Sequence, residues 1–174
     1  MSDSSLIIIA DTNVLINFLR IDRLDLIARH SYQFIITEHV REEITEHYPV
    51  QRQMLQKAIE DSVFTEKAVN ALEELELFGR LMREGRIGSG ECSAIACAIH
   101  GSYKLAIDDK RAIKEARKIS AELEILGTQE LVVSMILEQL LEVDEADKIK
   151  YAWEKEHRFK LKIPSFGDIL DSKC

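Results

Sequence analysis

The sequence predicts a three-layer α/β/α fold with a mostly parallel central sheet, and three observations lead to that prediction. Short apolar segments of strand length alternate with segments of helical periodicity. The first apolar segment, residues 6–10, has no polar break, which is typical of a strand buried on both faces. Acidic residues directly follow this segment and a later one, as Asp11 and as the pair Asp108-Asp109. Open α/β sheets bind ligands at the carboxyl ends of their strands, so these acids mark the expected site.

From the first strand to residue 65, the chain alternates between helix and strand patterns. Residues 14–19 have a helical pattern, continued by a second short piece at 24–27, and residues 34–36 form a strand. Thr37 can cap the next helix, and Pro49 marks the expected end of that helix. The remaining expectations are a helix at 51–59 and, at 63–65, either a short strand or only a connection.

The second half of the chain continues the alternation. An amphipathic helix is expected where apolar residues recur every three positions, at Val69, Leu72, Leu75, Phe78 and Leu81. Ser89 is expected to cap a buried helix at 90–99, and Thr128 a later helix that includes residues 131–140. The other expected elements are strands at 105–107 and 123–126, helices at 110–119 and 144–159, and a tail at 164–170.

Length and composition favour a single domain, residues 1–174, with a core at about 6–126 and a C-terminal helical extension at about 128–174. No apolar run approaches the ~20 residues that a membrane span requires, so we expect no membrane partner. The polar, acidic start (residues 1–5) does not resemble a secretory signal. The three cysteines, Cys92, Cys97 and Cys174, do not make a disulfide framework, and the first two read as core residues. We therefore expect a cytoplasmic protein. The net charge of −8 argues against a general nucleic-acid coat but not against a nuclease.

Helix geometry selects two glutamates to join the aspartates. Successive helical residues turn by about 100°, so with Val40 and Ile44 facing inward, Glu42 points to solvent and Glu43 lies on the flank of the inward face. Glu91 shares an azimuth with Ala94, Ile95 and Ala98, which places a carboxylate on the buried face of a first turn. An acid in the first turn of a helix can be there only to interact favourably with the helix dipole. A surface position would satisfy that role, so the dipole alone does not explain the inward azimuth of Glu91.

Several acids pointing at one spot repel one another and require compensation, which a hard divalent cation supplies. Mg²⁺ and Mn²⁺ prefer carboxylate oxygens and water, so one of these two ions fits better than Zn²⁺. His39, Glu43 and His47 recur at four-residue spacing, but this is not the zinc arrangement H-E-x-x-H, and exposed helix histidines explain it.

Four segments, taken together and in order, resemble the PIN domain, a family of metal-dependent ribonucleases that includes the toxins of VapBC-type toxin–antitoxin pairs. They are I-I-A-D-T-N-V-L at 8–15, V-R-E-E-I at 40–44, G-S-G-E-C-S-A-I-A-C-A at 88–98 and L-A-I-D-D at 105–109. The resemblance covers roughly residues 6–126, and the third segment is similar in particular to a prokaryotic branch with a longer C-terminal helical region. A PIN-like fold is therefore expected.

Residue by residue, the resemblance implies functional acids at Asp11, Glu43, Glu91 and Asp109, with Asp108 as a fifth. It places the family's polar residue after the first aspartate at Thr12 or Asn13. The family often has a threonine two places before the later aspartate, and this chain has Ile107 there.

The activity implied by the resemblance is hydrolysis of phosphodiester bonds in single-stranded RNA, with metal at Asp11, Glu91, Asp108 and Asp109. Glu43 would bind a second ion or orient the water, and the number of ions stays open. Expected substrate contacts are Thr12, Asn13, Lys110, Arg111, Lys114 and Arg117. The four basic residues share one helix, and an ordinary solvent-exposed helix face explains them equally well. Expected partners are RNA, an antitoxin protein and a second copy of the chain, the last suggested by apolar positions in the C-terminal helices.

Several other functions compete with this interpretation. A non-catalytic PIN-like module that binds RNA or protein is the main alternative, and the intact set of acids argues against it. A phosphoaspartate receiver requires an acid pair after its first strand and a lysine after a late strand, and residues 123–127 contain no lysine. A haloacid-type phosphatase requires D-x-D, which Asp11-Thr12-Asn13 is not. No Ser-His-Asp or Cys-His arrangement competes. Bases and aromatic residues alternate between Lys148 and Lys162, which could stack RNA bases, but Trp153 and Phe159 fit a core better.

Overall fold

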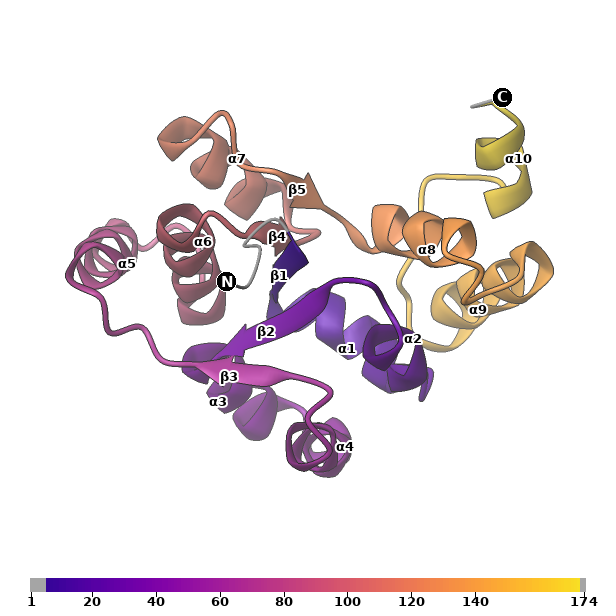
Figure 1. The fold of residues 1–174 in the computed structure, drawn as a ribbon, viewed down its shortest axis with the longest axis horizontal. Coiled ribbons are helices and arrows are strands. Elements are labelled where there is room, and N and C mark those ends of the chain that lie inside the picture. The colour runs from indigo at the N-terminus through magenta and orange to yellow at the C-terminus, as the bar shows by residue number, and fades with distance from the viewer. Residues whose placement is uncertain (1–5, 173–174) are drawn as a thin grey trace.

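The computed structural model describes residues 6–172, which form a five-stranded, fully parallel sheet covered by helices on both faces (Figure 1). The strand order is β3-β2-β1-β4-β5, with β1 at the centre. The strands are β1 (Ile7–Ala10), β2 (Gln33–Thr37), β3 (Thr65–Lys67), β4 (Lys104–Ala106) and β5 (Ile125–Leu126). The predicted α/β fold class is therefore confirmed. Residues 1–5 and Cys174, on which two expectations rest, lie outside the described residues.

Ten helices connect and surround these strands within residues 6–172. The first four are α1 (Thr12–Arg20), α2 (Leu24–Ala28), α3 (Glu38–His47) and α4 (Pro49–Glu60). The next three are α5 (Leu72–Glu84), α6 (Ser89–Gly101) and α7 (Lys110–Ile119). The C-terminal helices are α8 (Thr128–Leu137), α9 (Val143–Glu156) and α10 (Phe166–Asp171). None of these helices is both long and apolar enough to cross a membrane, as far as residues 6–172 are concerned.

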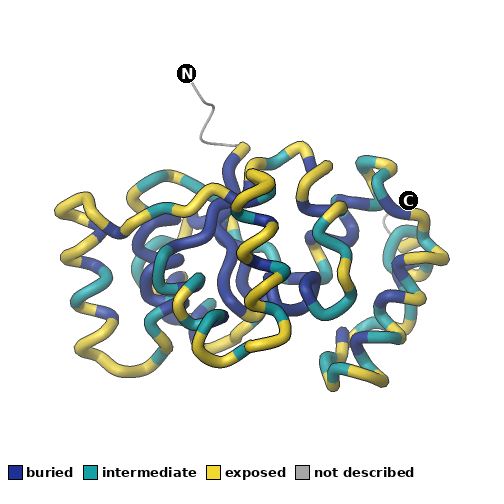
Figure 2. The backbone as a smooth tube through the Cα atoms, turned by 90° about the horizontal axis from the view of Figure 1, so that it is seen from below, coloured by how far each residue is buried: buried dark blue, intermediate teal, exposed yellow. Residues whose placement is uncertain are grey.

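The central strand is buried on both faces, and its alternating side chains enter two separate hydrophobic clusters. Ile7 and Ile9 pack with α5, α6 and α7, whereas Ile8 and Ala10 pack with α1 to α4 and the C-terminal helices. A strand buried on both faces has no polar side to alternate with, which explains the unbroken apolar run. In Figure 2 the buried residues are concentrated in the middle of the molecule.

The C-terminal helices pack directly against the body of the protein. Trp153 of α9 is fully buried, its ring contacts Phe18 and Phe159 edge to face, and its Nε1 donates a hydrogen bond to the Asn17 carbonyl oxygen at 2.7 Å. Phe166 of α10 is also fully buried. Trp153 is therefore a core residue and Phe159 packs against the core, as the sequence favoured.

Two predicted helix caps are wrong by one residue. The N-cap of α6 is Gly88 rather than Ser89, and that of α8 is Gly127 rather than Thr128. In both helices a glutamate at the third helical position accepts a hydrogen bond from the glycine N–H at 2.9 Å, which is the glutamate half of a capping box. At Gly127 an added Cβ would lie 2.8 Å from Asp108 Oδ1, so this site has no room for a side chain.

Two further expectations fail for geometric reasons. Positions three apart step back by about 60° around a helix, so the predicted stripe on α5 winds from the outside to the inside. Leu72 and Leu75 are consequently exposed, Leu81 is buried, and Val69 precedes the helix. The expected tail at 164–170 contains the helix α10, whose first turn is capped by the Ser165 hydroxyl, which accepts a hydrogen bond from the Asp168 N–H.

Candidate active site

The parallel sheet brings the ends of β1 and β4 together, and four acids gather there. Asp11 follows β1, Asp109 begins α7 after β4, Glu43 comes from the middle of α3, and Glu91 from the first turn of α6. We call Asp11, Glu43, Glu91 and Asp109 the acid cluster. Their charges act on one another, because Glu91 and Glu43 both raise the pKa of Asp11, and Asp109 and Glu43 both raise that of Glu91.

Asp11 is the buried centre of the acid cluster. Its side chain has no exposed surface, and it caps α1 by accepting a 3.3 Å hydrogen bond from the Asn13 N–H on Oδ2. Oδ1 is buried without any hydrogen-bond partner, the only carboxylate oxygen in that condition among residues 6–172. Burial first, and then the charge of Glu91, raise the pKa of Asp11 to about 8. A buried carboxylate with a free oxygen is costly unless something else compensates it.

Glu43 is held in the acid cluster by contacts from both sides. Its Oε2 accepts a 2.7 Å hydrogen bond from the Thr12 hydroxyl, whereas Glu42 is exposed, so the predicted helix face is confirmed. A Cβ at Gly90 would overlap Glu43 Oε2 and lie 3.0 Å from Thr12 Oγ1. The glycine therefore allows α6 to approach the carboxylate closely, which gives the G-x-G segment a physical role at the site.

A buried pair of hydroxyls fixes α3 against α6. The Thr37 hydroxyl caps α3 by accepting a hydrogen bond from the Val40 N–H at 3.2 Å. It also lies 2.6 Å from the Ser93 hydroxyl, which donates to the Gly90 carbonyl oxygen at 2.8 Å. Because these groups tie the start of α3 to the start of α6, the helices that carry Glu43 and Glu91 have a fixed spacing.

Glu91 and Asp109 form the more open side of the acid cluster. Burial is the main cause that raises the pKa of Glu91, whose Oε2 accepts a hydrogen bond from the Gly88 N–H. Asp109 Oδ1 accepts from the N–H groups of Arg111 and Ala112 at 2.8 and 2.9 Å and so caps α7. A hollow of about 330 Å³ opens beside them, lined by Gly85, Arg86, Ile87, Gly88, Glu91, Asp109 and Arg111.

Arg86 is a residue at this hollow that the sequence analysis missed. It is half exposed, and its Nη1 donates to both oxygens of Glu115 at 3.2 and 3.3 Å. Glu115 is buried on α7 and also pairs with Lys118, so it holds Arg86 beside the acids. The only sequence signal was a lone arginine between Gly85 and Gly88, and its partner lies 29 positions away.

The structure does not bring Asp108 into the acid cluster. Its Oδ1 accepts from the Thr128 N–H at 2.8 Å, and its Oδ2 accepts from the Thr128 hydroxyl at 2.5 Å and from Asn17 Nδ2 at 3.5 Å. Burial raises the pKa of Asp108, and the neighbouring charge that adds to this is Glu130. Asp108 therefore anchors α8 to the end of β4, while its neighbour Asp109 faces the acids.

The predicted substrate contacts divide into three groups. Arg111 lines the hollow and lowers the pKa of Glu91, and Lys110, Lys114 and the Asn13 side chain are exposed nearby. Thr12 is almost fully buried, and its hydroxyl already donates a hydrogen bond to Glu43. Arg117 lies far along α7, where its guanidinium donates to the carbonyl oxygens of Ala121 and Leu123.

The histidines of α3 serve other contacts. His39 packs against the Phe78 ring at 4.5 Å, and His47 is exposed. Neither therefore supports a zinc site with Glu43.

The fit of the acid cluster to a divalent cation rests on the chemistry of its donor atoms. In the described part of the chain, no three His, Cys, Asp or Glu side chains approach closely enough to hold an ion as they stand. The donor set still fits Mg²⁺ or Mn²⁺, because it consists of carboxylates and includes the free oxygen of Asp11. A cation there would compensate the charges that raise the pKa of Asp11 and Glu91.

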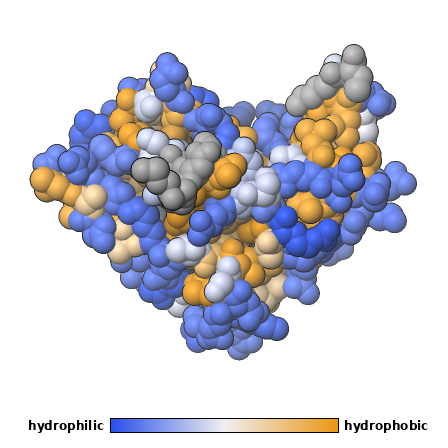
Figure 3. All heavy atoms as spheres, viewed as in Figure 1, coloured by the Kyte–Doolittle hydropathy of each residue, from blue (hydrophilic) through white to orange (hydrophobic). Residues whose placement is uncertain are grey.

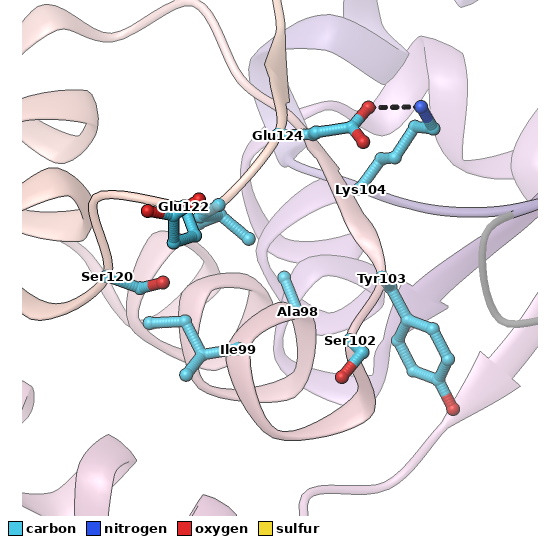
Figure 4. A pocket seen from close by; sticks show the side chains of 9 residues that line it. Ala98, Ile99, Ser102, Tyr103, Lys104, Ser120, Glu122 and Glu124 are labelled. Carbon is cyan, nitrogen blue, oxygen red and sulfur yellow. Dashed lines mark hydrogen bonds and ion pairs between the residues drawn. The ribbon is translucent and has the colours of Figure 1, made fainter.

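A second hollow lies at the amino end of the sheet and lacks this chemistry. It has a volume of about 280 Å³, and Figure 4 shows Lys104 and Glu124 paired on one side, with Ser120 and Glu122 entering from the chain after α7. None of the acids of the acid cluster lines it. The carboxyl end of the sheet is therefore the better candidate for an active site.

The fold and the acid cluster define an α/β protein with a carboxylate site at the carboxyl end of a parallel sheet. A PIN-domain family model matches residues 7–157, so the chain belongs to the PIN-domain family. No curated protein matches the chain. Among solved structures, VapBC2 from Rickettsia felis bound to a DNA fragment from their promoter contains a similar chain. The identity is 18%, the match covers 70% of this chain and 98% of that chain, and the TM-score is 0.46.

Proposed function

We propose that this PIN-domain protein is a metal-dependent endoribonuclease that hydrolyses phosphodiester bonds of single-stranded RNA. The observation that carries the proposal is Asp11 Oδ1, a buried carboxylate oxygen without a partner, surrounded by further acids. A protein that used this edge only for folding would gain stability by satisfying or removing that oxygen. The unpartnered oxygen of Asp11 is explained if it binds a cation when the protein acts on its substrate.

Asp11, Glu91 and Asp109 are the proposed ligands of Mg²⁺ or Mn²⁺. The ion would lower the pKa of a water molecule and neutralise charge that develops on the phosphate. Glu43 is the proposed group that positions the attacking water, because the Thr12 hydroxyl and Gly90 fix its carboxylate beside the other acids. Asp108 is left out of this ligand set because Thr128 and Asn17 occupy its oxygens.

RNA is the proposed substrate, and its backbone is proposed to approach along Arg86, Arg111, Lys110 and Lys114. Arg86 and Arg111 line the hollow next to Glu91 and Asp109, so they can hold phosphates on either side of the cleaved bond. These bases offset a strongly acidic chain of net charge −8. RNA binding should therefore weaken steeply with added salt, as a few local phosphate contacts predict.

A role as the toxin of a toxin–antitoxin pair, with an antitoxin protein as partner in the cytoplasm, follows from the family resemblance of the sequence. We include it in the proposal because the acid set of the family's nucleases is intact in this chain. The alternative is a PIN-like module that binds RNA or protein without cutting.

The test compares two neighbouring glutamates on one helix. Purified protein should cleave a pool of single-stranded RNAs with Mg²⁺ or Mn²⁺ and stop with EDTA. Glu43→Gln should lower the initial rate by roughly 10²–10³-fold, the range for loss of one positioned catalytic group. Glu42→Gln is the matched control, because it changes the same charge on an exposed position and should leave the rate within about twofold.

Two results would contradict the proposal. Equal effects of the two substitutions would show that Glu43 does not act at the site. Absence of metal-dependent cleavage, in protein that demonstrably binds Mn²⁺, would favour the non-catalytic module instead.

A further inference from the structure

A buried glutamate on α7 holds an arginine at the edge of the hollow that Glu91 and Asp109 line. Glu115 is only 6% exposed, and both of its oxygens accept hydrogen bonds from Arg86 Nη1. From this pair we propose that Arg86 binds a second backbone phosphate, next to the one that is cleaved, and that Glu115 is the residue that positions Arg86 for it. The inference rests on the proposed function and adds to it a preference for longer RNA over dinucleoside monophosphates, which have one phosphate only.

Exposed charge alone does not single out Arg86, because hydrophilic side chains predominate on the face of the molecule shown in Figure 3. Arg86 differs in how it is held. It lies in the short link between α5, which ends at Glu84, and α6, which begins at Ser89, and Glu115 fixes its side chain from a third helix. An arginine that is already held in place loses less conformational freedom when it binds a ligand.

The pairing with Glu115 leaves most of the guanidinium of Arg86 free. Only Nη1 bonds to Glu115, and neither Nε nor Nη2 donates a hydrogen bond to any group in residues 6–172. A guanidinium has five N–H donors, and two neighbouring donors bind phosphate oxygens as a pair. Since the Arg86 side chain is 54% exposed and lines the hollow, these donors are accessible to an anion there.

A third residue keeps this group of charges from being neutral. Lys118 Nζ donates a hydrogen bond to Glu115 Oε1 at 2.7 Å, so Glu115 pairs with Arg86 and Lys118 at once. Two cations and one carboxylate leave one positive charge in excess. In a chain of net charge −8, this local excess attracts an anion to the edge of the hollow.

The position of Glu115 along α7 separates Arg86 from the cleaved bond. Glu115 comes six residues after Asp109, which is about 9 Å along the helix axis. Arg111 is close to the start of the same helix, and its charge lowers the pKa of Glu91. Arg111 therefore acts next to the acids, whereas Arg86 is anchored farther out, where the neighbouring phosphate of the chain would lie.

The first experiment separates RNA binding from catalysis, with a short single-stranded RNA and Mn²⁺. Glu115→Gln should raise KM by about tenfold, as expected for one misplaced phosphate contact, and leave kcat within about twofold. Arg86→Ala should give the same division between KM and kcat. The double variant should be no worse than Arg86→Ala alone, because Glu115 acts only through Arg86.

The sign of the change distinguishes positioning from general electrostatics. Glu115→Gln removes a negative charge, so charge alone predicts tighter RNA binding, whereas loss of positioning predicts weaker binding. Glu124→Gln is the matched control, since it removes the same charge from an ion pair with Lys104 at the amino end of the sheet, and it should leave KM within about twofold. Arg86 is exposed, so Arg86→Ala tests the phosphate contact even if Glu115→Gln lowers the melting temperature.

The second experiment locates the phosphate. RNA binding is measured by fluorescence anisotropy with Mn²⁺ in a Glu43→Gln background, with one neutral methylphosphonate linkage moved along the RNA. Affinity should fall by about tenfold when the linkage beside the cleaved bond is neutral, and Arg86→Ala should abolish the effect at that position. Arg86→Ala should also reduce, by about tenfold, the ratio of kcat/KM for a trinucleotide to that for a dinucleoside monophosphate.

Three results would overturn the inference. They are an equal or lower KM in Glu115→Gln, a loss of kcat in Arg86→Ala, and a methylphosphonate effect that persists in Arg86→Ala. Failure of the proposed nuclease function has a different signature, because wild type would then bind RNA without cutting it. Weaker binding by Arg86→Ala and Glu115→Gln, but not by Glu124→Gln, would in that case still support the phosphate contact.

Discussion

Two aspartates follow the neighbouring strands β1 and β4, and their surroundings differ in kind. Burial raises the pKa of both Asp11 and Asp108. Asp108 accepts hydrogen bonds from the N–H and hydroxyl of Thr128 and from Asn17. Asp11 accepts one long bond from the Asn13 N–H, and its second oxygen has no partner.

The comparison separates a carboxylate that holds the fold together from one that is available for chemistry. A buried group whose oxygens are all bonded stabilises the structure, and here it attaches α8 to the sheet. A buried group with a free oxygen next to two other acids destabilises the isolated protein and is explained by a ligand. Position after a strand is common to both residues, so hydrogen-bond satisfaction is the distinguishing property.

The largest expected effect of this difference is on RNA cleavage. Asp11→Asn should lower the cleavage rate by roughly three orders of magnitude, since a bound metal contributes several kcal/mol to transition-state stabilisation. Asp108→Asn should lower it by less than about tenfold, through a shift of the neighbouring Asp109. Initial rates in saturating Mn²⁺ measure both.

A loss of activity in Asp108→Asn as large as that in Asp11→Asn would remove the distinction and return Asp108 to the ligand set. Melting temperatures of both variants must accompany the rates, so that unfolding is not mistaken for a lost ligand.

The parallel sheet, its buried central strand and the positions of the acids along the chain were predictable from the sequence, because strand length and apolar runs are local signals. The choice between Asp108 and Asp109 was not. The two residues are adjacent, and the contact that separates them is made with Thr128, 20 positions away from Asp108. Arg86 was missed for the same reason, since Glu115 positions it from another helix.

Helix faces were predictable only where the apolar spacing averages 3.6 residues. On α3 the four-residue spacing of Val40 and Ile44 assigned Glu43 to the site side. On α5 the prediction placed residues spaced by three on one helix face, although this spacing drifts around the helix, and Leu72 lies opposite the core.

The second effect concerns stability with and without metal. In EDTA, Asp108→Asn should lower the free energy of unfolding by about 1–3 kcal/mol, because it removes an acceptor from buried donors. Asp11→Asn should raise the melting temperature of the metal-free protein at neutral pH, because the buried Asp11 carboxylate must take up a proton on folding and the asparagine side chain need not. Thermal melts in EDTA measure both changes.

Excess Mg²⁺ sharpens the same measurement. Wild type and Asp108→Asn should both gain stability, by about 2.7 kcal/mol at a hundredfold excess over the dissociation constant, and Asp11→Asn should gain less. If metal-free Asp11→Asn melts well below wild type, Asp11 has a structural hydrogen bond rather than a metal, and the proposed site fails.

The smallest effect is a dependence of stability on pH in the metal-free protein. Burial raises the pKa of Asp11 to about 8 in the folded chain from its ordinary value of 3.8, so the folded state holds a proton that the unfolded state releases. Stability from this group is complete below pH 3.8 and falls as pH rises toward about 8.

Urea unfolding in EDTA between about pH 5 and about pH 8 should show a decline of up to about 1.4 kcal/mol per pH unit from this group. Asp11→Asn should reduce the decline without abolishing it, because the raised pKa values of Glu91 and Asp108 act in the same direction. In excess Mg²⁺ the decline should shrink in wild type, because the ion binds the deprotonated carboxylates more tightly as pH rises. A variant slope equal to that of wild type in EDTA would show that Asp11 is ionised in the folded protein, and the difference between the two aspartates would then lie only in their hydrogen bonds.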